Sequence, residues 1–133
     1  MFGGAIGVNA ASAIKRKMPT ICLDFDGVVH SYTSPWQGHG VISDPPTEGA
    51  KEFCEWAISA GYEIQILSTR ASKEDGLIAI TEWLDKHGFP AEVKLATDKP
   101  PAIIYVDDRG FRFEGKWDDV REILMDPSPW NKR

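Results

Sequence analysis

The stretch Thr-Ile-Cys-Leu-Asp-Phe-Asp-Gly, residues 20–27, decides how this sequence is interpreted. Residues 20–25 form a short apolar run that includes β-branched side chains, which is typical of a buried strand, and Asp26-Gly27 is a turn signal that ends it. Asp24 lies inside the apolar run, where an unpaired carboxylate would be costly. Because side chains alternate along a strand, Asp24 and Asp26 are expected to project toward the same side.

The chain beyond this strand alternates between helical and extended patterns. Strands are expected over residues 20–25, 63–68, 92–95 and 102–106, with a short fifth at 111–113. Helices are expected over residues 48–60, from a cap at Ser72 to a stop at Gly88, and over 116–124 with Trp117, Val120 and Leu124 directed inward. Strands that alternate with helices predict an α/β sandwich around a parallel sheet.

Length and composition set further bounds. A chain of 133 residues predicts one domain, here over residues 19–126, with a flexible N-terminal extension at 1–18 and an irregular tail at 127–133. The net charge of −5 argues against nonspecific electrostatic binding to nucleic acid or to an anionic membrane. No apolar run is long enough to span a bilayer. Cys22 and Cys54 fit two reduced core thiols, so a cytoplasmic protein is expected.

Polar residues follow three of the predicted strands. These are Asp24-Phe25-Asp26-Gly27, Ser68-Thr69-Arg70 and Asp107-Asp108-Arg109, with Lys99 between the last two groups. In an open parallel sheet, ligands bind beyond the carboxyl ends of the strands, so these groups are expected to converge. At least three carboxylates would then repel one another, and a hard divalent cation is the natural compensation. Oxygen ligands without His or Cys favour Mg²⁺.

Such a site has the parts needed for phosphoryl transfer. The Asp24 carboxylate can attack phosphorus to form an aspartyl-phosphate, while Mg²⁺ screens the repulsion between the two anions. Ser68, Lys99 and the backbone N–H groups around Gly27 would hold the phosphoryl oxygens. Asp26 is placed to protonate the leaving oxygen and then to activate water.

The motifs DFDGVVH (24–30), ILST (66–69), Lys99 and VDD (106–108) together resemble the haloacid dehalogenase superfamily, over roughly residues 20–110. The resemblance implies Asp24 as nucleophile, Asp26 as general acid and base, and Ser68 and Lys99 as phosphate ligands. It implies Mg²⁺ held by Asp24, the backbone carbonyl of Asp26, and Asp107, with Asp108 a further ligand or a support. It also implies a three-layer Rossmann-like sandwich with a mostly parallel sheet in the strand order 5-4-1-2-3.

The resemblance is to a member without a cap domain, because the loop over residues 28–46 suffices for a flap and not for a helical cap. Ser68-Thr69-Arg70 and Asp107-Asp108-Arg109 are similar to the Ser-Gly-Arg and Asp-Asp-Arg triplets of polynucleotide kinase 3′-phosphatase domains, with Thr69 in place of Gly. This implies substrate contacts from Thr69, Arg70 and Arg109. An uncapped site is also compatible with a homo-oligomer.

Several residues near this site have two interpretations. Arg70 and Arg109 each suit either a second phosphate or an ion pair with a neighbouring carboxylate. His30 and His39 in the loop over residues 28–46 are either polar surface or substrate contacts. Trp36 either anchors that loop or stacks on a base, with packing favoured.

The sequence therefore predicts a Mg²⁺-dependent phosphatase that acts on a small phosphate ester, a nucleotide or a nucleic-acid end. The alternative is a phosphate- or metal-binding module that keeps the fold without turnover. A receiver domain also has Asp, Thr and Lys around Mg²⁺. Its acidic pair, however, follows the first strand, whereas Asp107-Asp108 comes late here.

Overall fold

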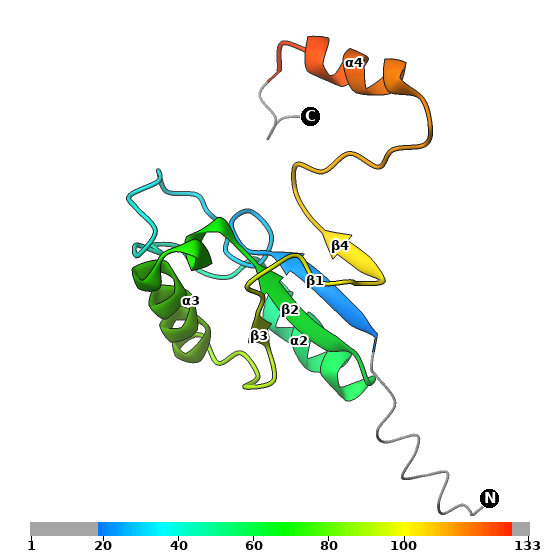
Figure 1. The fold of residues 1–133 in the computed structure, drawn as a ribbon. Helices are drawn as coiled ribbons and strands as arrows, with labels where there is room; N and C mark the ends of the chain where they lie inside the picture. The colour runs from blue at the N-terminus through cyan, green and yellow to red at the C-terminus, as the bar shows by residue number, and fades with distance from the viewer. Residues whose placement is uncertain (1–18, 129–133) are drawn as a thin grey trace, which may run out of the picture.

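Strand β1 (Thr20–Asp24) lies inside a four-stranded, all-parallel sheet in the computed structural model, which describes residues 19–128 (Figure 1). Its neighbours are β2 (Glu63–Leu67) and β4 (Ile104–Val106), and β3 (Lys94–Leu95) pairs with β2. The sheet order is therefore β3-β2-β1-β4, which agrees with the expected order for these four strands. The expected fifth strand at residues 111–113 does not form, and these residues pair with no strand of the sheet.

Helices α2 (Ala50–Ser59) and α3 (Glu74–Lys86) cover one face of the sheet. The register places Ile21 beside Ile64 and Leu23 beside Ile66, so these side chains share a face. They form one buried core with residues from both helices, namely Cys54, Ala57, Ile80, Trp83 and Leu84. The described part of the chain is thus a Rossmann-like α/β fold with two layers.

A third layer, on the opposite face of the sheet, is not formed by residues 19–128. Residues 96–103 join β3 to β4 without a helix, because this short link, which has two prolines, is too short for a helical crossover. Helix α4 (Trp117–Met125) lies apart from the sheet (Figure 1) and buries none of its residues. The expectation that Trp117 and Leu124 point inward is therefore wrong, since they are 72% and 76% exposed.

The start of α3 also differs from the expectation. Ser72 does not cap this helix, because its hydroxyl donates to the Thr69 carbonyl and Lys73 takes the N-cap position. Ser72 instead ends a short 3₁₀ helix, η1 (Thr69–Ser72). Gly76 lets η1 fold tightly onto α3, since a Cβ at Gly76 would overlap the Arg70 carbonyl. This close approach positions the segment that follows β2.

The long loop over residues 28–46, called the flap below, has no helix and no extended strand, as predicted. Its ends are fixed by backbone hydrogen bonds between Ser31 and Pro45 and between Thr47 and Val29. Trp83 of α3 joins the flap to the core, because its indole N–H donates to the Asp44 carbonyl at 3.0 Å and its ring packs against Phe25. The flap is therefore part of the folded unit.

Two other expectations concern the thiols and the ends of the chain. Cys22 and Cys54 are both free and buried, and burial raises the pKa of Cys54 to about 11. None of the helices within residues 19–128 has the length and apolar character needed to cross a bilayer. The expected extension at residues 1–18 and most of the expected tail lie outside the described residues.

The contrast between the core and α4 gives a stability prediction. Ile64→Ala should lower the free energy of unfolding by about 2–5 kcal/mol, because it leaves a cavity under the helices. Leu124→Ala should change it by no more than about 0.5 kcal/mol, because this side chain is largely exposed. Urea denaturation followed by circular dichroism measures both. A loss at Leu124 equal to the loss at Ile64 would mean that α4 packs on the domain.

Candidate functional site

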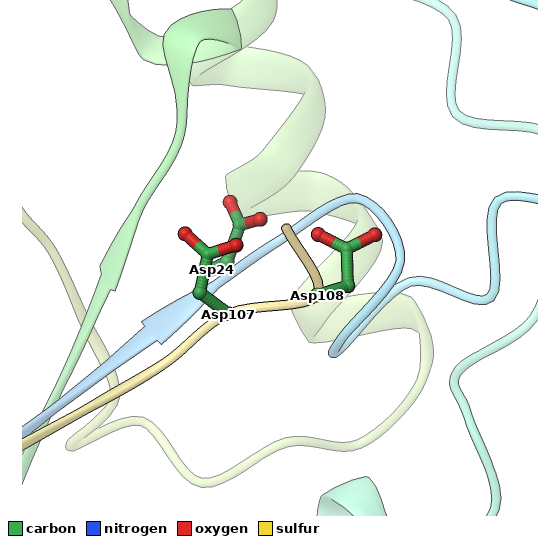
Figure 2. A group of neighbouring side chains, drawn as sticks. All are labelled: Asp24, Asp107 and Asp108. Carbon is green, nitrogen blue, oxygen red and sulfur yellow. The ribbon is translucent and has the colours of Figure 1, made fainter. Parts of the chain in front are cut away.

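Three carboxylates meet at the carboxyl end of the sheet. Asp24 is the last residue of β1, and Asp107 directly follows β4, whose Val106 pairs with Leu23, so the register sets the two side by side. One carboxylate oxygen from each of Asp24, Asp107 and Asp108 lies within 4.8 Å of the others. Figure 2 shows that the three groups point to the same side, with Asp108 next to the loop that follows β1. The predicted convergence is confirmed for these residues.

The electrostatics of this cluster are unfavourable for three negative charges. Burial is the largest cause that raises the pKa of Asp24, to about 6, and the charges of Asp107 and Asp108 raise it further. The Phe25 N–H donates to Asp24 Oδ1 at 2.9 Å and opposes this effect without cancelling it. A cation between the three carboxylates would remove the repulsion. The donor set contains oxygen alone, which fits a hard ion such as Mg²⁺.

Asp26 points into a different set of contacts. Its carboxylate accepts hydrogen bonds from His30 Nδ1 at 2.8 Å and from Arg70 Nε at 2.9 Å. Burial would raise the pKa of Asp26, but these two partners outweigh it and hold the pKa below its ordinary value. Asp26 is therefore a fixed carboxylate beside the cluster, and its side chain is not one of the three converging groups.

Arg70 occupies a place that its predicted role as a substrate ligand does not allow. Its side chain is 1% exposed. The Nε of Arg70 donates to Asp26, and the NH1 group donates to three backbone carbonyls of the flap. These belong to Gly38, His39 and Val41, at 3.0, 3.0 and 2.9 Å. The guanidinium is thus enclosed by protein, and the alternative interpretation, an ion pair with a neighbouring carboxylate, is the one observed.

His30 is likewise part of the interior, so its ring does not face a substrate. It is 1% exposed, and its Nε2 accepts the Asp44 N–H at 3.1 Å while Nδ1 contacts Asp26. Asp44 also accepts the Ser34 hydroxyl at 2.6 Å. The sequence does not indicate the anchoring role of Asp44, because its partners lie 10 to 39 residues away and no local pattern links them to it.

A cavity of about 320 Å³ opens in front of Asp24. Its lining includes the predicted site residues Asp24, Asp26, Ser68, Thr69, Asp107 and Arg109, together with Tyr32 and Trp36. Ser68 directly follows β2 and caps η1, since its Oγ accepts the Arg70 N–H at 3.1 Å. Tyr32 was not singled out from the sequence, because a tyrosine inside a long loop gives no signal of its own.

Lys99 lies at a second cavity, which Asp24 and Asp107 also line. It lines a smaller cavity of about 160 Å³ with Asp24, Asp107, Cys22 and Tyr105, among others. Its ammonium group lies 4.5 Å from the centre of the Tyr105 ring. The short link before β4 therefore does bring Lys99 to the candidate site, although it contains no helix.

Gly27 does not offer its backbone to a phosphate as expected. Its N–H donates to the His30 carbonyl at 2.8 Å, and the N–H groups of Val28, Val29 and His30 all donate to the Phe25 carbonyl. These groups are used inside the turn, so that part of the predicted phosphate cradle is wrong. Gly27 is needed for shape instead, because its φ is 87° and a Cβ there would overlap the Asp108 carboxylate.

Comparison with known proteins identifies no family for this chain. No family model matches the chain, and no curated protein matches its sequence. A crystal structure of a target protein from Vibrio cholerae is similar at 21% sequence identity with a TM-score of 0.49. The similarity covers 80% of this chain and 97% of that one.

The raised pKa of Asp24 predicts a specific pH dependence. The folded protein binds this proton more tightly than the unfolded chain, so the stabilisation is full below about pH 4 and is lost as pH rises through about 6. In metal-free protein, unfolding free energy should therefore fall from about pH 5 to about pH 7 more steeply than in Asp24→Asn. Urea titrations across this range measure it, and equal slopes in the two proteins would contradict it.

The buried Arg70 predicts a large loss of stability on substitution. Arg70→Met should lower the unfolding free energy by about 3 kcal/mol or more, because Asp26 and three carbonyls lose their partner. Arg121→Met is the matched control, since Arg121 pairs with Asp118 on the exposed surface and should contribute under about 1 kcal/mol. A similar, small effect at both positions in urea denaturation would show that the Arg70 contacts are weak.

Proposed function

We propose that this protein is a Mg²⁺-dependent phosphomonoesterase in which Asp24 is the nucleophile. The observation that carries the proposal is the meeting of Asp24, Asp107 and Asp108 at the carboxyl end of a parallel sheet. Asp24, Asp107 and Asp108 would hold the metal, and the ion would neutralise negative charge between the nucleophile and the phosphate. Ser68 and Lys99, which approach Asp24 from two cavities, would hold the phosphoryl oxygens.

The reaction would proceed in two steps. Asp24 Oδ forms a bond to phosphorus as the bond to the ester oxygen breaks, which gives an aspartyl-phosphate and a free alcohol. Water then attacks phosphorus, releases inorganic phosphate and restores the Asp24 carboxylate. An aspartate nucleophile has to be anionic, and a bound cation would lower the raised pKa of Asp24 toward that form.

Asp26 would transfer the protons in both steps. It lines the same cavity as Asp24, and Arg70 and His30 hold its carboxylate in one orientation. These contacts favour the anionic form, which suits acceptance of a proton from the attacking water. In the first step the acid form of Asp26 would donate the proton to the leaving oxygen. Because these contacts disfavour that form, esters whose leaving oxygen needs little protonation, such as aryl phosphates, should react fastest.

The fold and the order of the site residues support membership of the haloacid dehalogenase superfamily, as a member without a cap domain. The order of the four strands agrees with the resemblance. Asp24, Ser68 and Asp107 line one cavity, and Lys99 lines a second cavity beside Asp24 and Asp107, which supports the proposal. The flap is too small to act as a helical cap, so the site is open. The alternative, a phosphate- or metal-binding module without turnover, uses the same residues and differs only in the chemical step.

Hydrolysis of an aryl phosphate tests the proposal. The wild-type protein should release phosphate only when Mg²⁺ is present, and Asp24→Asn should lower kcat by at least about 1,000-fold because the amide is a poor nucleophile. Asp85→Asn is the matched control, since Asp85 is an exposed carboxylate on α3 and does not line either of the two cavities beside Asp24. It should retain wild-type activity.

Two results would contradict the proposal in different ways. Release of phosphate that persists in Asp24→Asn would exclude Asp24 as the nucleophile. Binding of Mg²⁺ and inorganic phosphate by the wild type, with no turnover of any phosphate ester, would favour the binding module.

A further inference from the structure

The cavity in front of Asp24 has an aromatic side that the proposed chemistry does not use. Its acidic and hydroxyl groups come from the ends of the strands, whereas Tyr32 and Trp36 come from the flap. The volume of about 320 Å³ is at the lower end of the range for small-molecule sites. A phosphate at Asp24 would therefore leave the rest of its ester beside these two rings.

Trp36 is held in place and yet remains accessible. The Arg70 guanidinium lies 4.6 Å from the centre of the indole, and the His39 ring meets it edge-on at 5.2 Å. Despite these contacts the side chain is 47% exposed. A tryptophan with a charged group on one face and an open surface at a cavity is suited to stack on a flat ring.

The flap around Trp36 is fixed on both sides. On its C-terminal side, Arg70 holds the carbonyls of residues 38, 39 and 41. On its N-terminal side, Ser34 donates its backbone N–H and its hydroxyl to Asp44 at 2.8 and 2.6 Å. The flap would therefore lose little conformational entropy when a ligand binds beside Trp36, and such preorganisation increases the affinity for the ligand.

Tyr32 shows backbone strain next to the same cavity. Its φ of 53° makes it the one residue other than glycine with positive φ within residues 19–128. A bulky residue in this region costs free energy, and strain of this kind concentrates where a side chain has to be presented in a particular direction. The strained backbone places Tyr32 among the residues that line the cavity.

We infer that the substrate is a nucleoside monophosphate, whose base stacks on Trp36 beside Tyr32 while its phosphate lies at Asp24. This inference rests on the proposed function and adds the substrate class to it. A net charge of −5 disfavours a long polyanion, which selects a mononucleotide over the end of a nucleic-acid strand. Stacking of a base on an aromatic side chain corresponds to a preference of about 5- to 150-fold.

Adenosine 5′-monophosphate and ribose 5-phosphate provide the test, because they have the same leaving oxygen and differ by the base. The wild-type kcat/KM with Mg²⁺ should be at least about 10-fold higher for the nucleotide. In Trp36→Ala this ratio should fall toward one, and Trp36→Phe should keep part of it. Trp56→Ala is the matched control, since Trp56 is an exposed tryptophan on α2 outside the cavity, and its ratio should equal that of the wild type.

Calorimetry with Asp24→Asn gives a second readout that needs no turnover. Adenosine 5′-monophosphate should bind at least about 5-fold more tightly than ribose 5-phosphate, and adding Trp36→Phe or Trp36→Ala should reduce that difference. Equal kcat/KM values and equal affinities for the two compounds would overturn the inference, while the proposed phosphatase activity would still stand. Tighter binding of a 5′- or 3′-phosphorylated oligonucleotide than of the mononucleotide would also overturn it, in favour of a strand end.

Absence of hydrolysis with both compounds and with an aryl phosphate would contradict the proposed function alone. The calorimetric comparison would then still decide whether the aromatic side of the cavity recognises a base.

Discussion

The guanidinium of Arg70 is the group on which the shape of the candidate site depends. A charge that is 1% exposed needs a counter-ion and hydrogen-bond acceptors, and Asp26 and three flap carbonyls supply them. Because these acceptors come from the loop after β1 and from the flap, one side chain after β2 fixes both segments. The orientation of Asp26, the position of Trp36 and the mouth of the cavity follow from this arrangement.

The carboxylate cluster has the opposite character, since it brings three like charges together at one end of the sheet. The pairing of β1 with β2 and β4 sets Asp24 beside Asp107, and the small Gly27 lets Asp108 approach the same turn. Burial and mutual repulsion then raise the pKa of Asp24 to about 6. An arrangement that costs stability in the absence of a ligand is typical of a binding or catalytic site.

The sequence predicted the parts of this protein that depend on local pattern. Apolar runs located the four strands, and the acidic residues at the ends of β1 and β4 located the cluster, although the expectation that Asp26 joins Asp24 there is wrong. Contacts between distant residues were not predictable in this way. For Arg70, substrate contact and an ion pair were both compatible with the sequence, because nothing near it in sequence indicates that Asp26, 44 residues away, would accept its hydrogen bonds.

Two further differences have physical causes of the same kind. The N–H groups after Gly27 were expected to bind phosphate, but the turn folds back so that they donate to the Phe25 and His30 carbonyls. The apolar stripe of α4 predicted an inward face, yet periodicity does not say which surface the helix meets, and in residues 19–128 it meets none of the sheet.

The central claim is that Asp24 accepts a phosphoryl group beside a metal held by the acidic cluster. A crystal structure with Mg²⁺ and beryllium fluoride, a mimic of the phosphoryl group, tests this most directly. The account predicts the beryllium atom bonded to an Asp24 carboxylate oxygen, with Mg²⁺ bound by Asp24 and Asp107. Density for Mg²⁺ elsewhere, or an unmodified Asp24 under saturating beryllium fluoride, would contradict it.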